Sequence, residues 1–355
     1  MEEAPPQTTV HPLESPEGRG AFRRALADWF RAGARDYPWR RTRDPYAILV
    51  SEAMLQQTRI ATVLEKGYFE RWMRAFPDWA SLAAAAEEDL LKAWEGLGYY
   101  NRARNLQRAA AEVCRRFDGS LPDDPDSIRS LPGVGPYTAG ALLSLAFDRP
   151  AALVDGNVSR VLSRLHACSV PVDSPAGIRL AWSRAESLVP ESAPGLHNSA
   201  LMELGQRVCR PSRPDCDACP VAAFCRARAL GEVDRYPAKM KKKQPTRRTE
   251  TVIAALRHGR IWLVQEKGSR RRGLWRLPEI PAEEAGDLPE MLRLEYAITR
   301  YRVSLRVHEP PGNWLPIPTG ASGAWHDLSA PDSWPPLGSP YKKALLKIAE
   351  MAGET

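Results

Sequence analysis

The chain has 355 residues, more than one ordinary domain holds, so two domains are expected. Hydrophobic residues make up 43% and charged residues 26%, a globular composition that excludes a mostly disordered chain. No run approaches the roughly 18 apolar residues of a membrane span, and residues 1–20 do not resemble a signal peptide, so a cytoplasmic protein is expected. Fifty Lys and Arg against 43 Asp and Glu give a formal charge of +7, which favours a polyanionic partner without identifying it.

Residues 21–235 are predicted to form an all-α domain. Apolar residues recur at helical spacing in four segments, namely 47–62, 89–94, 104–115 and 137–147. Strand-like alternation is nearly absent there, and proline and glycine mark plausible helix boundaries.

Residues 236–250 are predicted to be an interdomain linker, because a run of Lys and Arg flanked by prolines repels itself and stays extended. Beyond it, short β-rich runs at 251–256, 261–265 and 301–307 precede a helical pattern at 339–351. Residues 251–355 are therefore expected to form an α+β domain.

Four cysteines fall within one short segment as Cys209-x6-Cys216-x2-Cys219-x5-Cys225. Disulfides are improbable in a cytoplasmic chain, so crowded thiols indicate a metal, and four thiolates suit zinc or a 4Fe–4S cluster equally. The tight loops differ from the two widely spaced knuckles of a zinc ribbon, which favours iron–sulfur. Four ligands leave no open position, so the centre is expected to be structural.

A glycine-rich turn between two helical patterns predicts a helix–hairpin–helix motif at residues 128–139. Gly133 and Gly135 allow a close backbone approach, so that N–H groups beside a helix N-terminus can bind a DNA phosphate without reading sequence. The alternative is a tight αα-turn with a purely structural role.

Four further segments read Tyr37-Pro38-Trp39-Arg40, Ser51-Glu52-Ala53-Met54-Leu55-Gln56-Gln57-Thr58, Gly96-Leu97-Gly98-Tyr99-Tyr100 and Val154-Asp155-Gly156-Asn157-Val158. Together with the hairpin and the four cysteines, they resemble the helix–hairpin–helix, iron–sulfur DNA glycosylases, and among them the adenine DNA glycosylase (MutY) family. The resemblance covers residues 22–355. It implies an all-α glycosylase domain with a 4Fe–4S module, followed by an α+β Nudix-like domain.

The resemblance assigns catalysis to Glu52 as the acid that protonates the departing base and to Asp155 as the carboxylate beside the positively charged sugar, with Asn157 nearby. Cleaving an N-glycosidic bond requires such a pair, one carboxyl kept protonated by burial and one ionised. Glu52 lies on an apolar helical pattern, although acids on such helices more often face solvent. Asp155 alone would be interpreted as a helix N-cap, and both roles are compatible.

By the same resemblance, Arg35, Trp39 and Arg40 line a pocket for a flipped adenine, although Trp39 also suits a core position. Strand-cleaving relatives carry a lysine that forms a Schiff base where this chain has Tyr137. The resemblance therefore predicts a monofunctional glycosylase, with Tyr137 assisting Asp155 at the sugar.

Gln57 and Tyr99 resemble the residues that family members insert into the duplex to support the flipped base. Tyr100 is the alternative wedge, and tyrosines in such a turn also serve as packing residues. The sequence does not decide which ring faces DNA.

Residues 251–355 resemble the domain with which the family senses the opposite base. Segment 281–294 lacks the glutamate-dense helix of a Nudix hydrolase, so nucleotide hydrolysis is not expected. The family commonly carries an aromatic residue, Ser or Thr, and then His in the contacting loop, where this chain reads Ile298-Thr299-Arg300-Tyr301. Thr299 and Arg300 are the candidate contacts that remain.

Three functions stay open at this point. The leading one is a monomeric, nucleoid-associated bacterial enzyme that removes adenine mispaired with guanine or 8-oxoguanine in duplex DNA. The alternatives are a relative that removes another base, such as thymine opposite guanine, and an iron–sulfur protein that binds DNA without catalysis.

Overall fold

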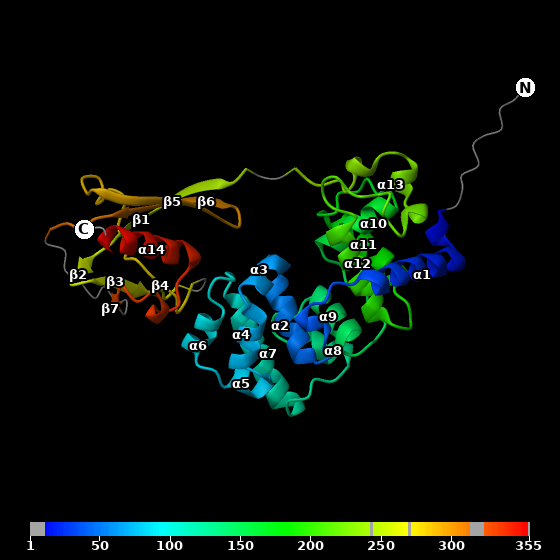
Figure 1. Cartoon of the computed structure of the whole chain (residues 1–355), viewed down its shortest axis with the longest axis horizontal. Helices are drawn as coiled ribbons and strands as arrows, with labels where there is room; N and C mark the ends of the chain where they lie inside the picture. Colours follow the sequence, from blue (N-terminus) through cyan, green and yellow to red (C-terminus); the bar gives the residue numbers. More distant parts are fainter. Residues whose placement is uncertain (1–10, 242–243, 269–270, 313–322, 354–355) are drawn as a thin grey trace, which may run out of the picture. The chain divides into compact units, whose positions relative to one another are not determined.

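The computed structural model describes residues 11–241, 244–268, 271–312 and 323–353 (Figure 1). The helical half of the chain contains α1 (Pro16–Gly33), α2 (Pro45–Leu55), α3 (Ile60–Glu65), α4 (Tyr68–Ala75), α5 (Trp79–Ala83), α6 (Glu87–Ala93), α7 (Asn101–Phe117), α8 (Pro125–Arg129), α9 (Pro136–Ala141), α10 (Gly156–Leu165), α11 (Pro175–Leu188), α12 (Pro194–Arg207) and α13 (Arg226–Ala229). A helical first half is therefore confirmed.

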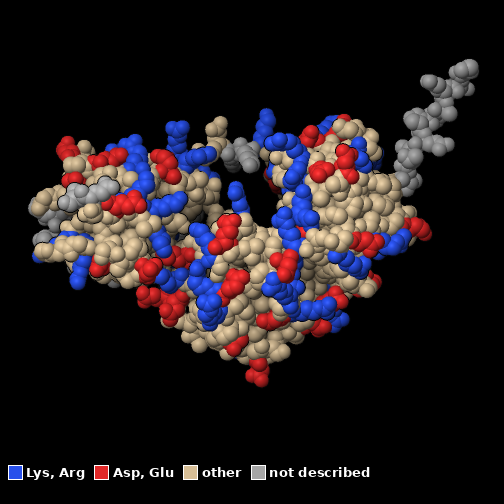
Figure 2. Space-filling view, in the orientation of Figure 1, with Lys and Arg blue, Asp and Glu red and all other residues tan. Residues whose placement is uncertain are grey.

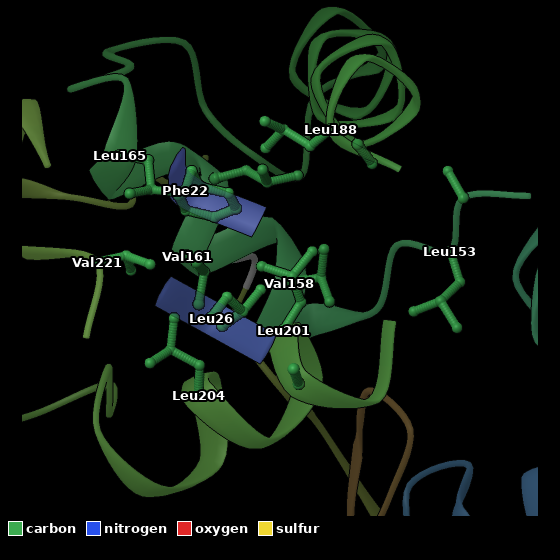
Figure 3. Close-up of a cluster of buried hydrophobic side chains, with 14 of the residues drawn as sticks. Phe22, Leu26, Leu153, Val158, Val161, Leu165, Leu188, Leu201, Leu204 and Val221 are labelled. Carbon is green, nitrogen blue, oxygen red and sulfur yellow. The ribbon is translucent and has the colours of Figure 1, made fainter. Parts of the chain in front are cut away.

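Contacts divide the chain into two compact units, residues 1–56 with 112–241 and residues 57–111 with 242–355. The first unit is built around α1, α10 and α12, which bury apolar faces against one another (Figure 3). Its core includes Phe22 and Leu26 from α1, Val158 and Val161 from α10, and Leu201 and Leu204 from α12. This packing fixes the helices that carry the candidate site.

The second unit contains α3–α6, most of α7 and the C-terminal sheets. Its strands are β1 (Thr246–Ile253), β2 (Leu256–Arg257), β3 (Arg260–Gln265), β4 (Trp275–Arg276), β5 (Glu290–Ile298), β6 (Tyr301–His308) and β7 (Gly323–Asp327), and the last helix is α14 (Ser339–Gly353). One sheet has the order β1-β6-β5, with β1 parallel to β6, and in the other β3 pairs with β2, β4 and β7. The expected α+β architecture of the C-terminal region is confirmed.

The core of the C-terminal region lies between the two sheets and α14. Val252 of β1, Leu263 of β3, Leu305 of β6 and Leu345 of α14 are fully buried in one cluster. Figure 1 shows α14 between the two sheets, in agreement with this cluster.

Two sequence predictions need correction. The helical pattern at 47–62 is two helices, because α2 ends at Leu55, Gln57 takes a positive φ of 60° and α3 begins only at Ile60. The predicted linker is too long at its C-terminal end, because β1 starts at Thr246 and pairs with β6 from its first residue. Pairing with a distant strand is not visible in the local charge pattern that predicted the linker.

No helix in the described part of the chain is long and apolar enough to span a membrane. On the face in Figure 2, Lys and Arg side chains are spread widely and interspersed with Asp and Glu. The excess positive charge is therefore not gathered into one patch on that face.

Candidate active site

The α2 helix places Glu52 in the interior of the first unit. Asp44 caps the N-terminus by accepting hydrogen bonds from the backbone N–H groups of Tyr46 (3.0 Å) and Ala47 (3.3 Å), and Pro45 occupies the first turn. The helix is buried on nearly all sides, and Glu52 is only 5% exposed. The sequence left open whether Glu52 is buried or faces solvent, and the structure shows that it is buried.

Tyr137, in the first turn of α9, donates a hydrogen bond of 2.6 Å from its hydroxyl to Oε2 of Glu52. The pKa of Glu52 is raised to about 7, chiefly by burial and also by the charge of Asp155, against the lowering effects of the Tyr137 hydrogen bond and of Arg40. Near neutral pH, Glu52 is thus poised between its protonated and ionised forms. The hydroxyl of Tyr137 thus binds Glu52, and its expected assistance to Asp155 stays a prediction.

Asp155 is the N-cap of α10, and each of its carboxylate oxygens accepts one hydrogen bond. Oδ1 accepts from the backbone N–H of Val158 (2.7 Å), and Oδ2 accepts from Nδ2 of Asn157 (2.7 Å). The N-cap interpretation is confirmed. Both carboxylate oxygens of Asp155 are therefore hydrogen-bonded at a helix N-terminus, whereas Glu52 lies on a helix that is buried on nearly all sides.

Arg160 connects this carboxylate to the cysteine segment. Its Nη2 donates to Oδ1 of Asn157 (3.0 Å) and to the carbonyl of Gly205 (2.8 Å), and its Nε donates to the carbonyl of Cys209 (2.8 Å). A continuous set of hydrogen bonds therefore runs from Asp155 through Asn157 and Arg160 to the backbone of Cys209.

The expected base-pocket residues lie between α1 and α2. Trp39, in the 3-10 helix Pro38–Arg40, is 8% exposed and stacks on Tyr37 at a ring-centroid distance of 5.4 Å. The guanidinium of Arg40 lies over the Tyr37 ring at 4.7 Å. Arg35 is exposed, and its backbone makes hydrogen bonds, through its N–H to Glu203 and through its carbonyl with Arg40. Arg40 is thus the pocket candidate whose charge reaches Glu52.

The predicted hairpin is present as α8, a tight turn and α9. Gly133 has a φ of 80°, which favours glycine, and Gly135 is the N-cap residue of α9. A Cβ atom at Gly135 would meet nothing within 4 Å, so the turn is open there. The geometry leaves room for an anion to approach the N-terminal N–H groups of α9.

Gln57 and Tyr99 belong to the second unit and share a positive φ, of 60° and 48°. Tyr99 is 46% exposed, with the guanidinium of Arg102 over its ring at 5.7 Å. Tyr100 is only 6% exposed, and its hydroxyl donates to the carbonyl of Leu337 (2.9 Å). Of the two adjacent tyrosines, Tyr99 is therefore the one available to a ligand.

The four clustered cysteines are partly buried, free thiols beside the core of the first unit. Arg164 donates from Nη1 to Sγ of Cys209 (3.3 Å). The pKa of Cys219 is raised to about 11, chiefly by burial and also by the charges of the other three cysteines, against a backbone hydrogen bond at Val221 that lowers it. Among the described residues, no group of three or more His, Cys, Asp or Glu is arranged as a metal site. The donor set suits four-thiolate coordination, and the metal itself stays a prediction.

In the C-terminal region, Thr299 and Arg300 form the turn between β5 and β6. Thr299 has a φ of 51°, and Arg300 donates to the hydroxyl of Tyr301 (2.9 Å). The side chain of Arg300 is thus oriented by Tyr301, whose ring it covers at 5.1 Å.

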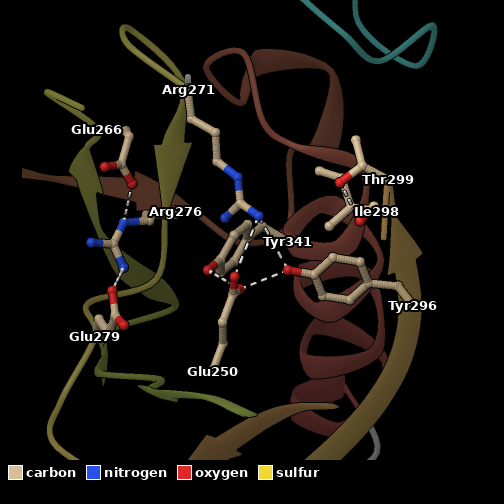
Figure 4. Close-up of polar contacts among 9 residues, drawn as sticks. All are labelled: Glu250, Glu266, Arg271, Arg276, Glu279, Tyr296, Ile298, Thr299 and Tyr341. Carbon is tan, nitrogen blue, oxygen red and sulfur yellow. Dashed lines mark hydrogen bonds and ion pairs between the residues drawn. The ribbon is translucent and has the colours of Figure 1, made fainter. Parts of the chain in front are cut away.

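Below this turn, the polar side chains are paired with one another (Figure 4). Glu250 of β1 accepts hydrogen bonds from the hydroxyls of Tyr296 (2.7 Å) and Tyr341 (3.0 Å) and pairs with Arg271 (3.3 Å). A second arginine, Arg276, pairs in the same way with two further glutamates, Glu266 (2.6 Å) and Glu279 (2.9 Å). These three acids are thus engaged with arginines, and the absence of nucleotide hydrolysis stays a prediction.

Sequence reasoning did not identify Arg160, Arg164 and Glu203, which the structure places beside the site. All three are buried charged residues on apolar helix faces. Glu203 is a lone acid within an apolar helical run, as Glu52 is, and this signal could have pointed to it.

Comparison with known proteins agrees with this geometry. Residues 50–178 match the HhH-GPD superfamily of base excision DNA repair proteins. An adenine DNA glycosylase from Rattus norvegicus is 45% identical over 216 residues, which cover 58% of this chain and 42% of that protein. An adenine DNA glycosylase from Buchnera aphidicola (subspecies Acyrthosiphon pisum) is 32% identical over 256 residues, 72% of each chain. A thermostable thymine-DNA glycosylase of known structure is 30% identical with a TM-score of 0.55, covering 60% of this chain and 97% of that one.

The fold and these matches place the chain in the helix–hairpin–helix class of base excision DNA repair proteins. More particularly, the chain belongs to the adenine DNA glycosylase family. It spans less than half of the length of the rat relative.

Proposed function

We propose that this protein is a monofunctional DNA glycosylase that hydrolyses the N-glycosidic bond of adenine mispaired with 8-oxoguanine or guanine in duplex DNA. The observation that carries the proposal is the contrast between two carboxyl groups of one unit. Glu52 is buried with its pKa near 7, whereas Asp155 accepts two hydrogen bonds at a helix N-terminus. The reaction needs this pair, because charge of opposite sign develops on the base and on the sugar.

In the proposed mechanism, Glu52 donates a proton to the departing adenine. Its pKa near 7 keeps a substantial protonated fraction at neutral pH, so the group is efficient as a general acid. Tyr137 orients the carboxyl group through its 2.6 Å hydrogen bond. Arg35, Trp39 and Arg40 are the proposed lining of the pocket that receives the flipped base.

Asp155 then stabilises the positive charge that develops on the sugar. Asn157 fixes the direction of the carboxylate, and Arg160 fixes Asn157 in turn. Because Tyr137 has no amine, this chain cannot form a Schiff base at that position, and the product is expected to be an intact strand with an abasic site.

The proposal includes duplex DNA as partner, bound through the hairpin at Gly133 and Gly135 and through Gln57 and Tyr99. Cys209, Cys216, Cys219 and Cys225 would hold a 4Fe–4S cluster, whose four thiolate ligands leave no position for substrate, so its role is structural. Thr299 and Arg300 are the proposed contacts to the opposite base. We further propose a monomeric enzyme associated with the bacterial nucleoid.

The experiment that tests this function is single-turnover cleavage of duplexes that carry adenine opposite 8-oxoguanine, guanine or thymine, together with a T·G duplex. Each reaction is quenched with and without alkali. We expect release of adenine opposite 8-oxoguanine and guanine, with strand breaks only after alkali. Release of thymine alone would instead assign the chain to the alternative specificity that the likeness to a thymine-DNA glycosylase suggests, and breaks without alkali would contradict the monofunctional mechanism.

A further inference from the structure

Glu203 is a buried carboxylate on α12 whose role the catalytic assignment leaves open. Its side chain is 0% exposed. Oε2 accepts a hydrogen bond from Nη1 of Arg40 (2.5 Å), and Oε1 accepts from Nη1 of Arg207 (2.7 Å) and from the backbone N–H of Arg35 (3.2 Å). Burying an unpaired carboxylate would cost much of the free energy of folding, so the three donors are needed to keep Glu203 in this position.

These contacts fix the segment that joins α1 to α2. Arg40 also donates to the carbonyl of Arg35 (2.9 Å), and Arg207 donates to the carbonyl of Gly33 (2.5 Å). Glu203 thus holds the backbone on which Trp39 and Arg40 lie, and it holds the Arg40 side chain directly.

The same helix reaches the catalytic pair through the preceding residue. The hydroxyl of Tyr137, which donates to Glu52, also lies 3.5 Å from Sδ of Met202. Glu203 and Glu52 are therefore connected through Arg40 on one side and through Met202 and Tyr137 on the other.

We propose that Glu203 is a positioning residue for base release: it holds Arg40 beside the Glu52 site and neutralises the charge of that arginine, so that Glu52 retains its proton. The inference rests on the proposed function. Hydrogen-bonded ion pairs of this kind are short and directional, which suits a positioning role.

The charges around Glu52 predict in which direction its pKa changes when Glu203 is removed. The groups that act on it are Tyr137 of α9, Asp155 at the start of α10, and Arg40, which alone is a cation. Burial would raise the pKa of Glu203, but the hydrogen bonds from Arg40 and Arg207 outweigh it and lower this pKa, so Glu203 is an anion at neutral pH. Removing that anion leaves Arg40 unneutralised, and a lone cation lowers the pKa of Glu52.

The test is the pH profile of single-turnover adenine release by the full chain. In Glu203→Gln, the basic limb, where Glu52 loses its proton, should move to lower pH by about one unit, which makes release about tenfold slower on the alkaline side. In Arg40→Gln the cation is absent, so the limb should move to higher pH. In the double variant Arg40→Gln with Glu203→Gln, the basic limb should lie at the same pH as in Arg40→Gln alone, because Glu203 acts through Arg40.

Arg207→Gln is the matched control, since it removes another donor to the same carboxylate but not the cation near Glu52. Its limb should coincide with that of the unmodified protein. A limb unchanged in Glu203→Gln, or a Glu203→Gln shift that persists without Arg40, would overturn the proposal. If Glu203→Gln does not fold, the contrast between Arg40→Gln, whose limb should move to higher pH, and Arg207→Gln, whose limb should not move, still tests the proposal. If the unmodified protein releases no adenine, the proposed function fails rather than this inference.

Discussion

At the scale of single residues, Glu52 is held in a balance of opposed effects. Burial and Asp155 raise its pKa, whereas Tyr137 and Arg40 lower it, and the result lies close to neutral pH. Such a balance is typical of a group that must carry a proton to a reaction and release it there. Each neighbour is therefore a means of changing the pH dependence without removing the acid.

Tyr137→Phe should move the basic limb of adenine release to higher pH. The substitution removes a hydrogen bond that stabilises the ionised form of Glu52, so the pKa of Glu52 rises and its proton is kept to higher pH. Single-turnover rates between pH 5.5 and 9 measure the shift. Tyr236→Phe is the control: it removes a hydroxyl that binds Glu232 (3.3 Å) away from the site, so the basic limb should not change. A limb that moves to lower pH in Tyr137→Phe would contradict the assignment of Glu52 as the acid.

Glu52→Gln should stabilise the fold more at pH 8 than at pH 5. The pKa of Glu52 is about 7 in the folded chain against 4.5 for the ordinary group, so the folded state binds more protons between these values and loses stability as pH rises through them. The cost is on the order of 3 kcal/mol above pH 7, by the usual conversion of pKa shifts. Thermal unfolding at both pH values checks this. Glu186→Gln, at an exposed position, serves as control. An equal change of Tm at both pH values in Glu52→Gln would contradict a raised pKa of Glu52.

The sequence pointed to Glu52, Asp155 and Asn157 because their types and spacing match a family pattern. The structure buries Glu52 and joins Asp155 to Asn157 at the N-terminus of α10. It did not identify Glu203 or Arg160, because their roles depend on partners that are distant along the chain. Arg160 contacts Cys209, and Glu203 contacts Arg40. Pairing of this kind is a property of the folded core that no local pattern carries.

At the scale of elements, glycines set how closely the helices approach the site. A Cβ atom at Gly140 of α9 would lie 2.0 Å from the carbonyl oxygen of Ala152, shortly before Asp155. A Cβ atom at Gly205 of α12 would lie 2.7 Å from Cβ of Asn157. Both distances are too short for any side chain, so α9 and α12 pack directly against the backbone that carries Asp155 and Asn157.

Gly140→Ala should therefore affect mainly the stability of the fold, and Gly135→Ala mainly the affinity for duplex DNA. Gly140→Ala should lower Tm by several degrees and slow adenine release, since α9 or the Asp155 segment must shift; overpacking of this kind typically costs about 1–3 kcal/mol. Gly135 has open space and a negative φ, so Gly135→Ala should keep Tm and weaken binding of duplex DNA. Calorimetry and binding titrations measure the two effects. Loss of stability in Gly135→Ala together with unchanged DNA affinity would exclude the phosphate-binding role of the turn.

The helical class and the hairpin were predictable because periodicity and glycine spacing are local signals. The end of α2 at Leu55 was not, because the apolar pattern continues through a left-handed residue at Gln57. Nor was the π-helical turn Leu142–Ala146 that follows α9, in which Ser144 accepts a hydrogen bond from Asn198 of α12. Tertiary hydrogen bonding decides such features.

At the scale of the whole molecule, each of the two units carries proposed contacts of its own to DNA. The proposed catalytic carboxyl groups and the hairpin belong to the first unit, and Tyr99 and the turn at Thr299 and Arg300 belong to the second. The opposite-base contact was the part that the sequence predicted least, because the turn lacks the usual side chains of the family. The structure adds that Arg300 is oriented by Tyr301.

Arg300→Ala should reduce the preference for adenine opposite 8-oxoguanine over adenine opposite guanine. A lost base contact typically costs about 1–3 kcal/mol of discrimination, whereas the chemistry at Glu52 is untouched. The ratio of single-turnover rates on the two duplexes measures the effect. Arg293→Ala, which removes an arginine paired with Glu290 on β5, is the matched control; an unchanged ratio in Arg300→Ala would remove this residue from the recognition of the opposite base.

The central claim is that Glu52 and Asp155 release adenine as acid and counter-charge. The most direct measurement is single-turnover release from a duplex with adenine opposite 8-oxoguanine by the unmodified chain, Glu52→Gln and Asp155→Asn, with affinity for the same duplex measured in parallel. We expect alkali-dependent release by the unmodified chain and a loss of at least about a hundredfold in each variant, with binding retained. Release at an undiminished rate by both variants would contradict the account.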